Sequence, residues 1–156
     1  MAERSSVAAA KVEWELVITR VFDAPRELVF KAWSEPERVM QWLGPKGFTA
    51  LEFEMNPRPG GGWHARMRSP DGAVYANRGI VHEVVEPDRL VFGFAWEDES
   101  GGFGSETLVT ISFAEVGGKT EMTFSQTGFA SAEDRDGHRE GWSESFDKLA
   151  EYLASD

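Results

Sequence analysis

The chain of 156 residues contains no cysteine. This absence excludes disulfide bonds, cysteine-ligated metals and thiol nucleophiles. Basic residues are also few, because 16 Lys and Arg stand against 27 Asp and Glu, which gives a net charge of −11. A chain this acidic repels nucleic-acid phosphates and anionic membrane surfaces unless a local basic patch offsets the charge, and the sequence shows no such patch. We therefore expect neither a nucleic acid nor a membrane as a partner.

Long apolar runs are absent too. No stretch of the sequence reaches the roughly 18 apolar residues that a membrane span requires. The first ten residues, MAERSSVAAA, lack the basic start and apolar segment of a secretory signal peptide. They predict a flexible tail over residues 1–10, followed by a single domain over residues 11–156, which is close to the usual domain size. We expect a cytoplasmic protein.

The common motifs of catalytic and metal sites are also missing. His64, His82 and His138 occur singly, without HExxH spacing, so we predict no metal and no other cofactor. The glycines at 60–62 lack the lysine and hydroxyl residue of a phosphate-binding loop and lead into an expected strand. Without cysteine or a GxSxG motif, the sequence argues against an acyl-enzyme mechanism.

The C-terminal segment, by contrast, has a clear helical pattern. It predicts an amphipathic helix over residues 132–154, whose start is marked by Ser131 and Asp134 in the manner of a capping box. About 23 residues at ~1.5 Å each make a rod long enough to lie along a whole sheet. Its apolar stripe has the spacing i, i+4, i+7 and i+11 and consists of Trp142, Phe146, Leu149 and Leu153.

The N-terminal part predicts a strand and two short helices. Residues 12–22 are rich in β-branched and aromatic side chains, which favours a strand. We expect Asp23 to cap the first helix, with Pro25 in its first turn. We expect Ser34 and Glu37 to form a capping box for the second helix.

Alternating apolar and polar residues dominate the middle of the chain. The alternation predicts about six antiparallel strands with one wet face, separated by turns and by a Gly-rich acidic loop at 97–105. Such a sheet must cover its apolar face, and the C-terminal helix is long enough to do so. The predicted class is α+β: a curved antiparallel sheet of about seven strands around a long C-terminal helix, with two short helices after the first strand. A pocket would form between sheet and helix.

Four segments resemble a known family: ITRVFDAPRELVFKAWSEPERVMQWLGP, GGGWHARMRSPDG, GIVHEVVEPDRLVF and GHREGWSESFDKLAEYLA. With the order of elements, they resemble the heat-shock protein 90 ATPase activator homologues, which belong to the START-like or SRPBCC superfamily. The resemblance covers roughly residues 12–153. It implies the helix-grip fold and a cavity for an apolar ligand, but no single activity. The co-chaperone that gives the family its name uses an additional N-terminal domain that this chain lacks, so a chaperone partner does not follow from the resemblance.

Twelve aromatic and methionine residues are candidate pocket walls. As a group they favour a cavity, because such side chains leave irregular gaps, although a closed, dry core would use the same residues. Gly141 and Ser145 either leave room for a ligand or allow close contact between helix and sheet. The twelve candidates are Trp42, Phe53, Met55, Trp63, Met67, Phe92, Phe94, Trp96, Met122, Phe124, Trp142 and Phe146.

Two residues are weak candidates for acid–base catalysis in such a cavity. Glu83 is the one acidic residue in an otherwise apolar stretch of strand, and strand parity leaves its direction open. Facing inward, it would be a buried carboxylate suited to proton transfer; facing outward, it would lie in solvent or pair with an arginine such as Arg78, and we favour the outward position. His138 lies four residues before Trp142 and could point into the pocket mouth.

Three hypotheses of function follow. The leading one is binding of a hydrophobic small molecule, such as a lipid, an aromatic polyketide or a degradation intermediate, without catalysis. The second is a cyclase-like or hydrolase-like enzyme with one acid–base residue in the cavity. The third is a co-chaperone-like interaction module. Homodimerisation through an edge strand or the loop at 97–105 stays open, since no residue pattern predicts it.

Overall fold

The computed structural model describes residues 14–98 and 100–155. The expected N-terminal tail and the start of the expected first strand lie outside this range. The described part contains, in chain order, β1 (Leu16–Phe22), α2 (Arg26–Ser34), α3 (Pro36–Val39), β2 (Thr49–Met55), β3 (Gly62–Arg68), β4 (Val74–Val85), β5 (Arg89–Trp96), β6 (Thr107–Val116), β7 (Lys119–Thr127) and α4 (Ala132–Ser155).

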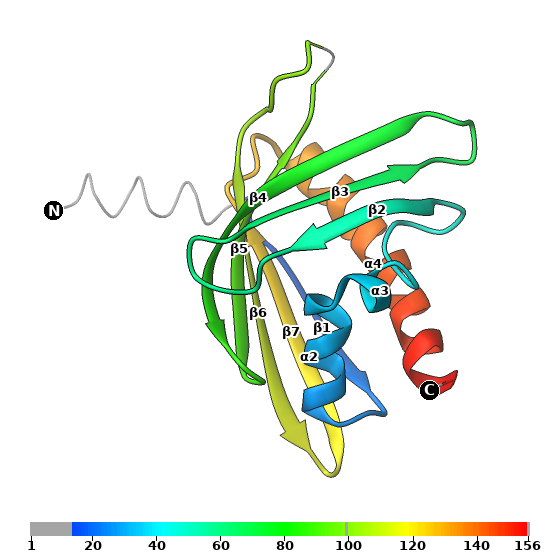
Figure 1. The fold of residues 1–156 in the computed structure, drawn as a ribbon, viewed down its shortest axis with the longest axis vertical. Helices are drawn as coiled ribbons and strands as arrows, with labels where there is room; N and C mark the ends of the chain where they lie inside the picture. Colours follow the sequence, from blue (N-terminus) through cyan, green and yellow to red (C-terminus); the bar gives the residue numbers. More distant parts are fainter. Residues whose placement is uncertain (1–13, 99, 156) are drawn as a thin grey trace, which may run out of the picture.

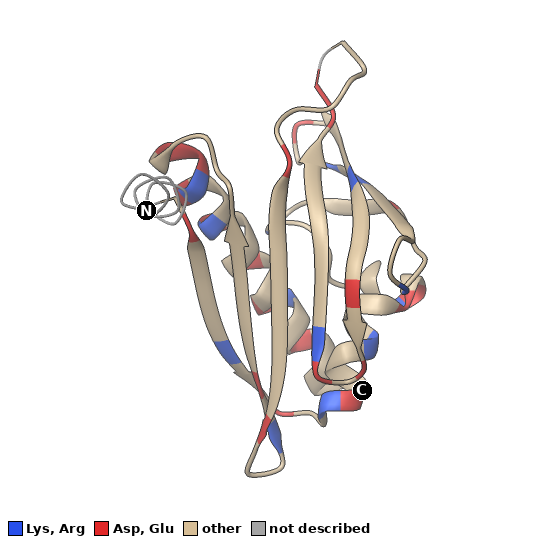
Figure 2. Cartoon of the chain, turned by 90° about the vertical axis from the view of Figure 1, so that its left-hand side faces the viewer, with Lys and Arg blue, Asp and Glu red and all other residues tan. Residues whose placement is uncertain are grey.

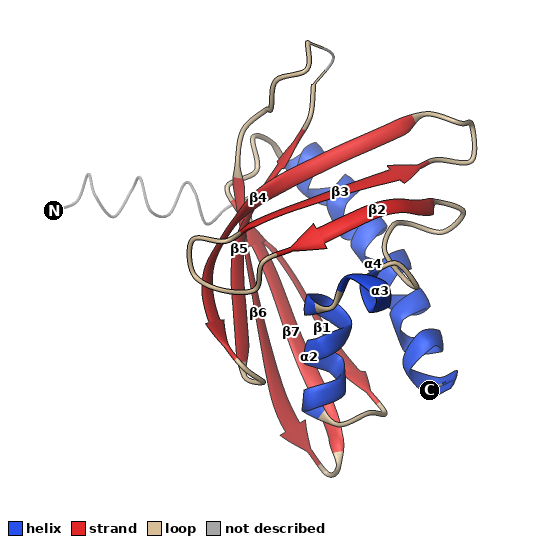
Figure 3. Ribbon diagram, viewed as in Figure 1, coloured by secondary structure: helices blue, strands red, loops and turns tan. Residues whose placement is uncertain are grey.

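The seven strands form one antiparallel sheet in the order β1-β7-β6-β5-β4-β3-β2. Consecutive strands from β2 to β7 are neighbours, whereas β1 pairs with β7, so β1 and β2 are the two edges. The sheet curls, and all three helices lie on its concave side (Figures 1 and 3). This is the architecture that the sequence predicts. It places one face of every strand against the helices and the other toward solvent.

Alternation along the strands fixes which side chains reach the concave side. In β3, Trp63, Ala65 and Met67 are buried, while the residues between them are exposed or half-buried. The turn at 69–72 that connects β3 to β4 closes with a hydrogen bond from Gly72 N to Ser69 O of 2.9 Å, as its sequence predicts.

Helix α4 packs its predicted stripe into the core. Phe146 and Leu149 are completely buried, and Trp142 and Leu153 nearly so. The helix begins where the capping box places it, since Asp134 N donates a 3.1 Å hydrogen bond to the Ser131 hydroxyl. Among the described residues, no helix is long and apolar enough to cross a membrane.

The two expected caps of the short helices are wrong. Pro25 is extended, with ψ of 154°, so α2 starts only at Arg26 and Asp23 makes no cap. Ser34 is the last residue of α2, and its hydroxyl therefore reaches back to the Phe30 carbonyl, at 3.2 Å. The N-cap position of α3 is Glu35, again without a side-chain cap bond.

A close approach between two glycines shapes the sheet between β4 and β5. A Cβ atom on Gly79 would lie 1.8 Å from the carbonyl oxygen of Gly93 and 2.6 Å from Trp63 Nε1. The indole of Trp63 uses this space, because its N–H donates a 2.8 Å hydrogen bond to Gly93 O. A few residues further on, the β4–β5 register shifts between Val81 and Glu83, which marks a bulge.

Charged side chains are spread over the ribbon. Figure 2 shows Lys and Arg interspersed with Asp and Glu along the strands and helices. Several of the basic residues pair with a neighbouring acid, such as Arg38 with Glu35 at 2.8 Å. Exposed pairs of this kind contribute little to stability.

Candidate ligand cavity

A cavity of about 560 Å³ lies between the concave face of β2–β5, the segment around α3, and α4. Small-molecule sites in proteins usually measure roughly 300–1,000 Å³, so the volume suits a ligand. The walls are mainly aromatic. Trp63 packs edge-on against Phe92, with 5.4 Å between ring centroids, and lies 5.6 Å from Phe94. On the helix side, Trp142 faces Phe94 at 6.0 Å.

Most of the predicted wall residues do line this cavity. Nine of the twelve candidates take part: Trp42, Phe53, Met55, Trp63, Met67, Phe92, Phe94, Trp96 and Trp142. Gly141 and Ser145 line it as well, so the small residues beside Trp142 border open space.

Met122, Phe124 and Phe146 do not line the cavity, and for these three the prediction is wrong. All three are completely buried in solid core. Phe124 lies 4.7 Å from the ring of Trp142 and 5.3 Å from that of Phe146. These rings fill the space between β7 and α4, which leaves the open volume on the β2–β5 side.

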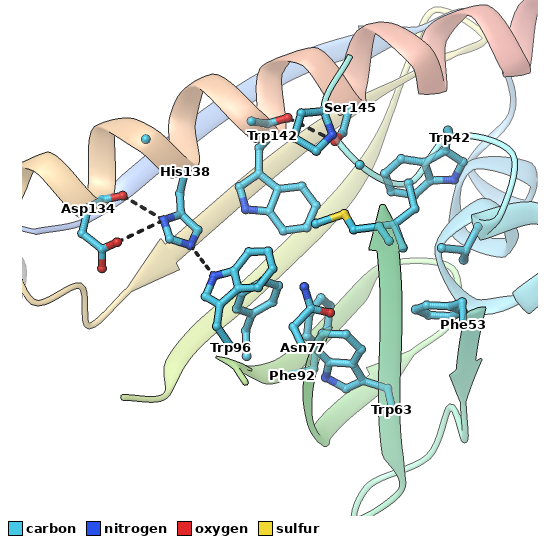
Figure 4. A pocket seen from close by; sticks show the side chains of 18 of the residues that line it. Trp42, Phe53, Trp63, Asn77, Phe92, Trp96, Asp134, His138, Trp142 and Ser145 are labelled. Carbon is cyan, nitrogen blue, oxygen red and sulfur yellow. Dashed lines mark hydrogen bonds and ion pairs between the residues drawn. The ribbon is translucent and has the colours of Figure 1, made fainter. Parts of the chain in front are cut away.

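Several wall residues were not among the candidates, and they include Trp33 and Asn77. Trp33 comes from α2, where its helical spacing indicates only a buried face. Asn77 lies in β4, buried on the cavity side. A polar residue at an inward-facing position of a strand can indicate a cavity wall. The sequence of β4, however, does not establish which alternate residues face inward. Figure 4 shows Asn77 among Phe92, Trp96 and Trp63, directed into the cavity.

Glu83 lies outside the cavity, as the favoured interpretation held. Its side chain is about half exposed and accepts a 2.5 Å hydrogen bond from Arg89 Nε, not from Arg78. The bulge in β4 explains why the alternation of its residues did not establish the direction of Glu83. Val81 is completely buried, and the register shift turns Glu83, two residues later, to the outside.

His138 does line the cavity, but both of its ring nitrogens are engaged. Trp96 Nε1 donates to His138 Nε2 at 2.8 Å, and His138 Nδ1 lies 2.8 Å from the carbonyl oxygen of Asp134 (Figure 4). An indole N–H can only donate and a carbonyl can only accept, so these contacts fit the neutral Nδ1–H tautomer. His138 thereby joins α4 to β5 and has no ring nitrogen left for a substrate.

A family model for "Activator of Hsp90 ATPase homolog 1-like protein" matches residues 23–154. The chain belongs to this family. A comparison with curated proteins found no match.

Solved structures agree with this family membership. The AHSA1 protein of Silicibacter pomeroyi is 27% identical, with a TM-score of 0.83 over 90% of this chain and 97% of its own. A protein from Chromobacterium violaceum is 25% identical, with a TM-score of 0.84 over 92% and 99%. A protein from Mycobacterium smegmatis is 28% identical, with a TM-score of 0.78 over 90% of each chain. These names state neither a ligand nor a reaction.

Lys148 connects α4 to the rim of the cavity through hydrogen bonds. Its ammonium lies 3.1 Å from the carbonyl oxygen of Gly44 and 3.4 Å from those of Leu43 and Phe48. Desolvation by burial lowers the pKa of Lys148, and the nearby Glu151 offsets part of this effect. The contacts fix the loop between α3 and β2, in which residues 42–45 line the cavity.

Strand pairing brings Glu52, Glu54 and His64 together on the outer face of the sheet. These three residues form no recognisable motif in the sequence. Glu54 is the cross-strand partner of His64, and His64 Nε2 lies 3.5 Å from Glu52 Oε2. The ligand atoms of these three side chains lie within 4.8 Å of one another, close enough to hold a metal ion. The group is half-exposed, and exposed groups of this kind are common without a metal. Chain spacing could not reveal it, because strand pairing creates it.

Proposed function

We propose that the protein binds an apolar small molecule in the cavity between the sheet and α4, in the cytoplasm and without catalysing a reaction. The observation that supports this proposal is the cavity itself. Protein interiors are close-packed, and an unfilled apolar volume costs stability because its walls lose contacts. A solvent-connected pocket of about 560 Å³ with mainly apolar walls therefore favours an apolar occupant. Lipids, aromatic polyketides and degradation intermediates all fit the apolar walls.

The absence of catalysis is supported by the two candidate residues. Glu83 lies outside the cavity, and His138 uses both ring nitrogens within the protein. The family's name refers to activation of the Hsp90 ATPase, whereas the cavity supports binding of a small molecule. We therefore favour a carrier or sensor over an enzyme.

Native mass spectrometry of protein purified from its own host tests this proposal. We expect a co-purifying small molecule, or, after its removal, a raised melting temperature with members of an apolar compound library. A ligand at ~100 times its Kd adds about 2.7 kcal/mol to the free energy of unfolding. A protein that carries no small molecule and whose melting temperature no compound changes would contradict the proposal.

A cavity-filling variant provides the control. Ser145 is buried on the cavity side of α4, and Ser145→Leu would place a larger side chain in the ligand volume. Glu140→Leu introduces the same residue at an exposed position of the same helix. We expect the first variant to lose ligand binding and the second to retain it, with both folded by circular dichroism.

A further inference from the structure

Two buried polar groups in the cavity wall have no hydrogen-bond partner. Asn77 is 6% exposed, and its Oδ1 accepts no hydrogen bond from the described residues. Trp33 is 4% exposed, and its indole N–H likewise has no acceptor there. A buried group left unsatisfied is costly, so a ligand group or water molecule that can pair with it is favoured.

Comparable buried groups nearby do have hydrogen-bond partners within the protein. A second buried amide, Gln126, uses both ends: its Nε2 donates to Thr107 Oγ1, and its Oε1 accepts from Trp142. The four other indoles of the cavity wall all donate at 2.8–2.9 Å, each to its own acceptor: Trp42 to Ala32 O, Trp63 to Gly93 O, Trp96 to His138 Nε2 and Trp142 to Gln126 Oε1. The two unsatisfied groups are thus exceptions, and both residues line the cavity.

The charged groups of the wall limit what the missing partner can be. The charged side chains that line the cavity are the acidic residues Glu133 and Asp134, and the described lining includes no Lys or Arg. The ammonium of Lys148, beside the rim, is already surrounded by carbonyl oxygens. A carboxylate ligand would be repelled by the acidic residues and would lose its hydration without gaining a cationic partner.

We infer that the ligand is an uncharged, largely apolar molecule with one hydroxyl or carboxamide group, which hydrogen-bonds to the side-chain amide of Asn77. This inference rests on the proposed function and names the chemistry of its ligand. A hydroxyl or carboxamide both donates and accepts hydrogen bonds, so it can pair with either end of the Asn77 side-chain amide. The amide of Asn77 offers one donor and one acceptor group whichever way it is turned.

Three probes of the same ring system test the inference: 2-naphthol, naphthalene and 2-naphthoate, measured by isothermal titration calorimetry at neutral pH. A net hydrogen bond of about 1 kcal/mol corresponds to roughly fivefold in Kd. We expect 2-naphthol to bind at least about fivefold more tightly than naphthalene and 2-naphthoate to bind more weakly than either. In Asn77→Leu, the preference for 2-naphthol over naphthalene should shrink. The signals of the Asn77 side-chain NH2 group in an NMR spectrum should shift more with 2-naphthol than with naphthalene.

Stability of the ligand-free protein gives an independent measurement. Asn77→Leu removes an unsatisfied group and should raise the melting temperature, whereas Gln126→Leu removes a satisfied one and should lower it. Equal binding of 2-naphthol and naphthalene, or tight binding of 2-naphthoate, would overturn the inference while leaving apolar binding intact. Failure of all three probes to bind would overturn the inference, whereas the proposed function is overturned only if native mass spectrometry and the apolar compound library also find no ligand.

Discussion

The close approach of β4 and β5 at Gly79 yields a quantitative prediction. In Gly79→Ala, the new methyl group would lie 1.8 Å from Gly93 O and 2.5 Å from Gly93 C, both backbone atoms that cannot rotate away. It would also lie 2.6 Å from Trp63 Nε1. The strands must therefore separate, or the indole must leave its place over Gly79. Because Trp63 lines the cavity, either movement also changes the ligand site.

The cost has two parts. Loss of the 2.8 Å bond from Trp63 Nε1 to Gly93 O leaves a buried polar group unsatisfied, at roughly 1–3 kcal/mol. Forcing a methyl group into a filled position costs about another 1–3 kcal/mol. We expect Gly79→Ala to lower the free energy of unfolding by about 2–6 kcal/mol. For a chain of this length, the melting temperature should fall by at least about 4 °C.

Urea unfolding followed by circular dichroism measures this change, with Gly62→Ala as the matched control. Gly62 is also a strand glycine, at the start of β3, and a Cβ atom there meets nothing within 4 Å. The control should be neutral or slightly stabilising, since alanine restricts the unfolded chain. Trp63→Phe, which removes the hydrogen bond but adds no methyl group, should fall between the two. If Gly79→Ala is as stable as Gly62→Ala within about 0.5 kcal/mol, the argument from close approach is wrong.

Two further predictions concern α4. Phe146→Ala should destabilise the protein by about 3–5 kcal/mol in the same urea assay, because the ring is completely buried against Phe124. Glu140→Ala, at an exposed position of the same helix, should change the stability by no more than about 0.5 kcal/mol. Similar values for the two variants would contradict the packing of the apolar stripe. For Lys148, burial lowers the pKa from 10.5, so the unfolded chain binds the proton more tightly and the folded state gains stability as pH rises toward that value. As pH rises toward 10.5, wild type should therefore gain stability relative to Lys148→Met, and parallel curves would exclude the effect.

The sequence alone determined the features that depend on neighbours in the chain. The stripe of α4 and its start at Ser131 follow from spacing and capping, which are local interactions. The inward face of β3 follows from strict alternation. The predictions of helix caps at Asp23 and Ser34 were wrong, because α2 starts at Arg26 and ends at Ser34, which the local pattern does not indicate.

Only the tertiary structure decided which residues surround open space. The bulge after Val81 sets the direction of Glu83, and a shift of strand register has no local signature in an apolar stretch. Phe124 and Phe146 resemble wall residues in sequence, but the packing between β7 and α4 makes them core. The unsatisfied state of Asn77 depends on what every neighbouring strand and helix leaves unpaired, which no single segment encodes.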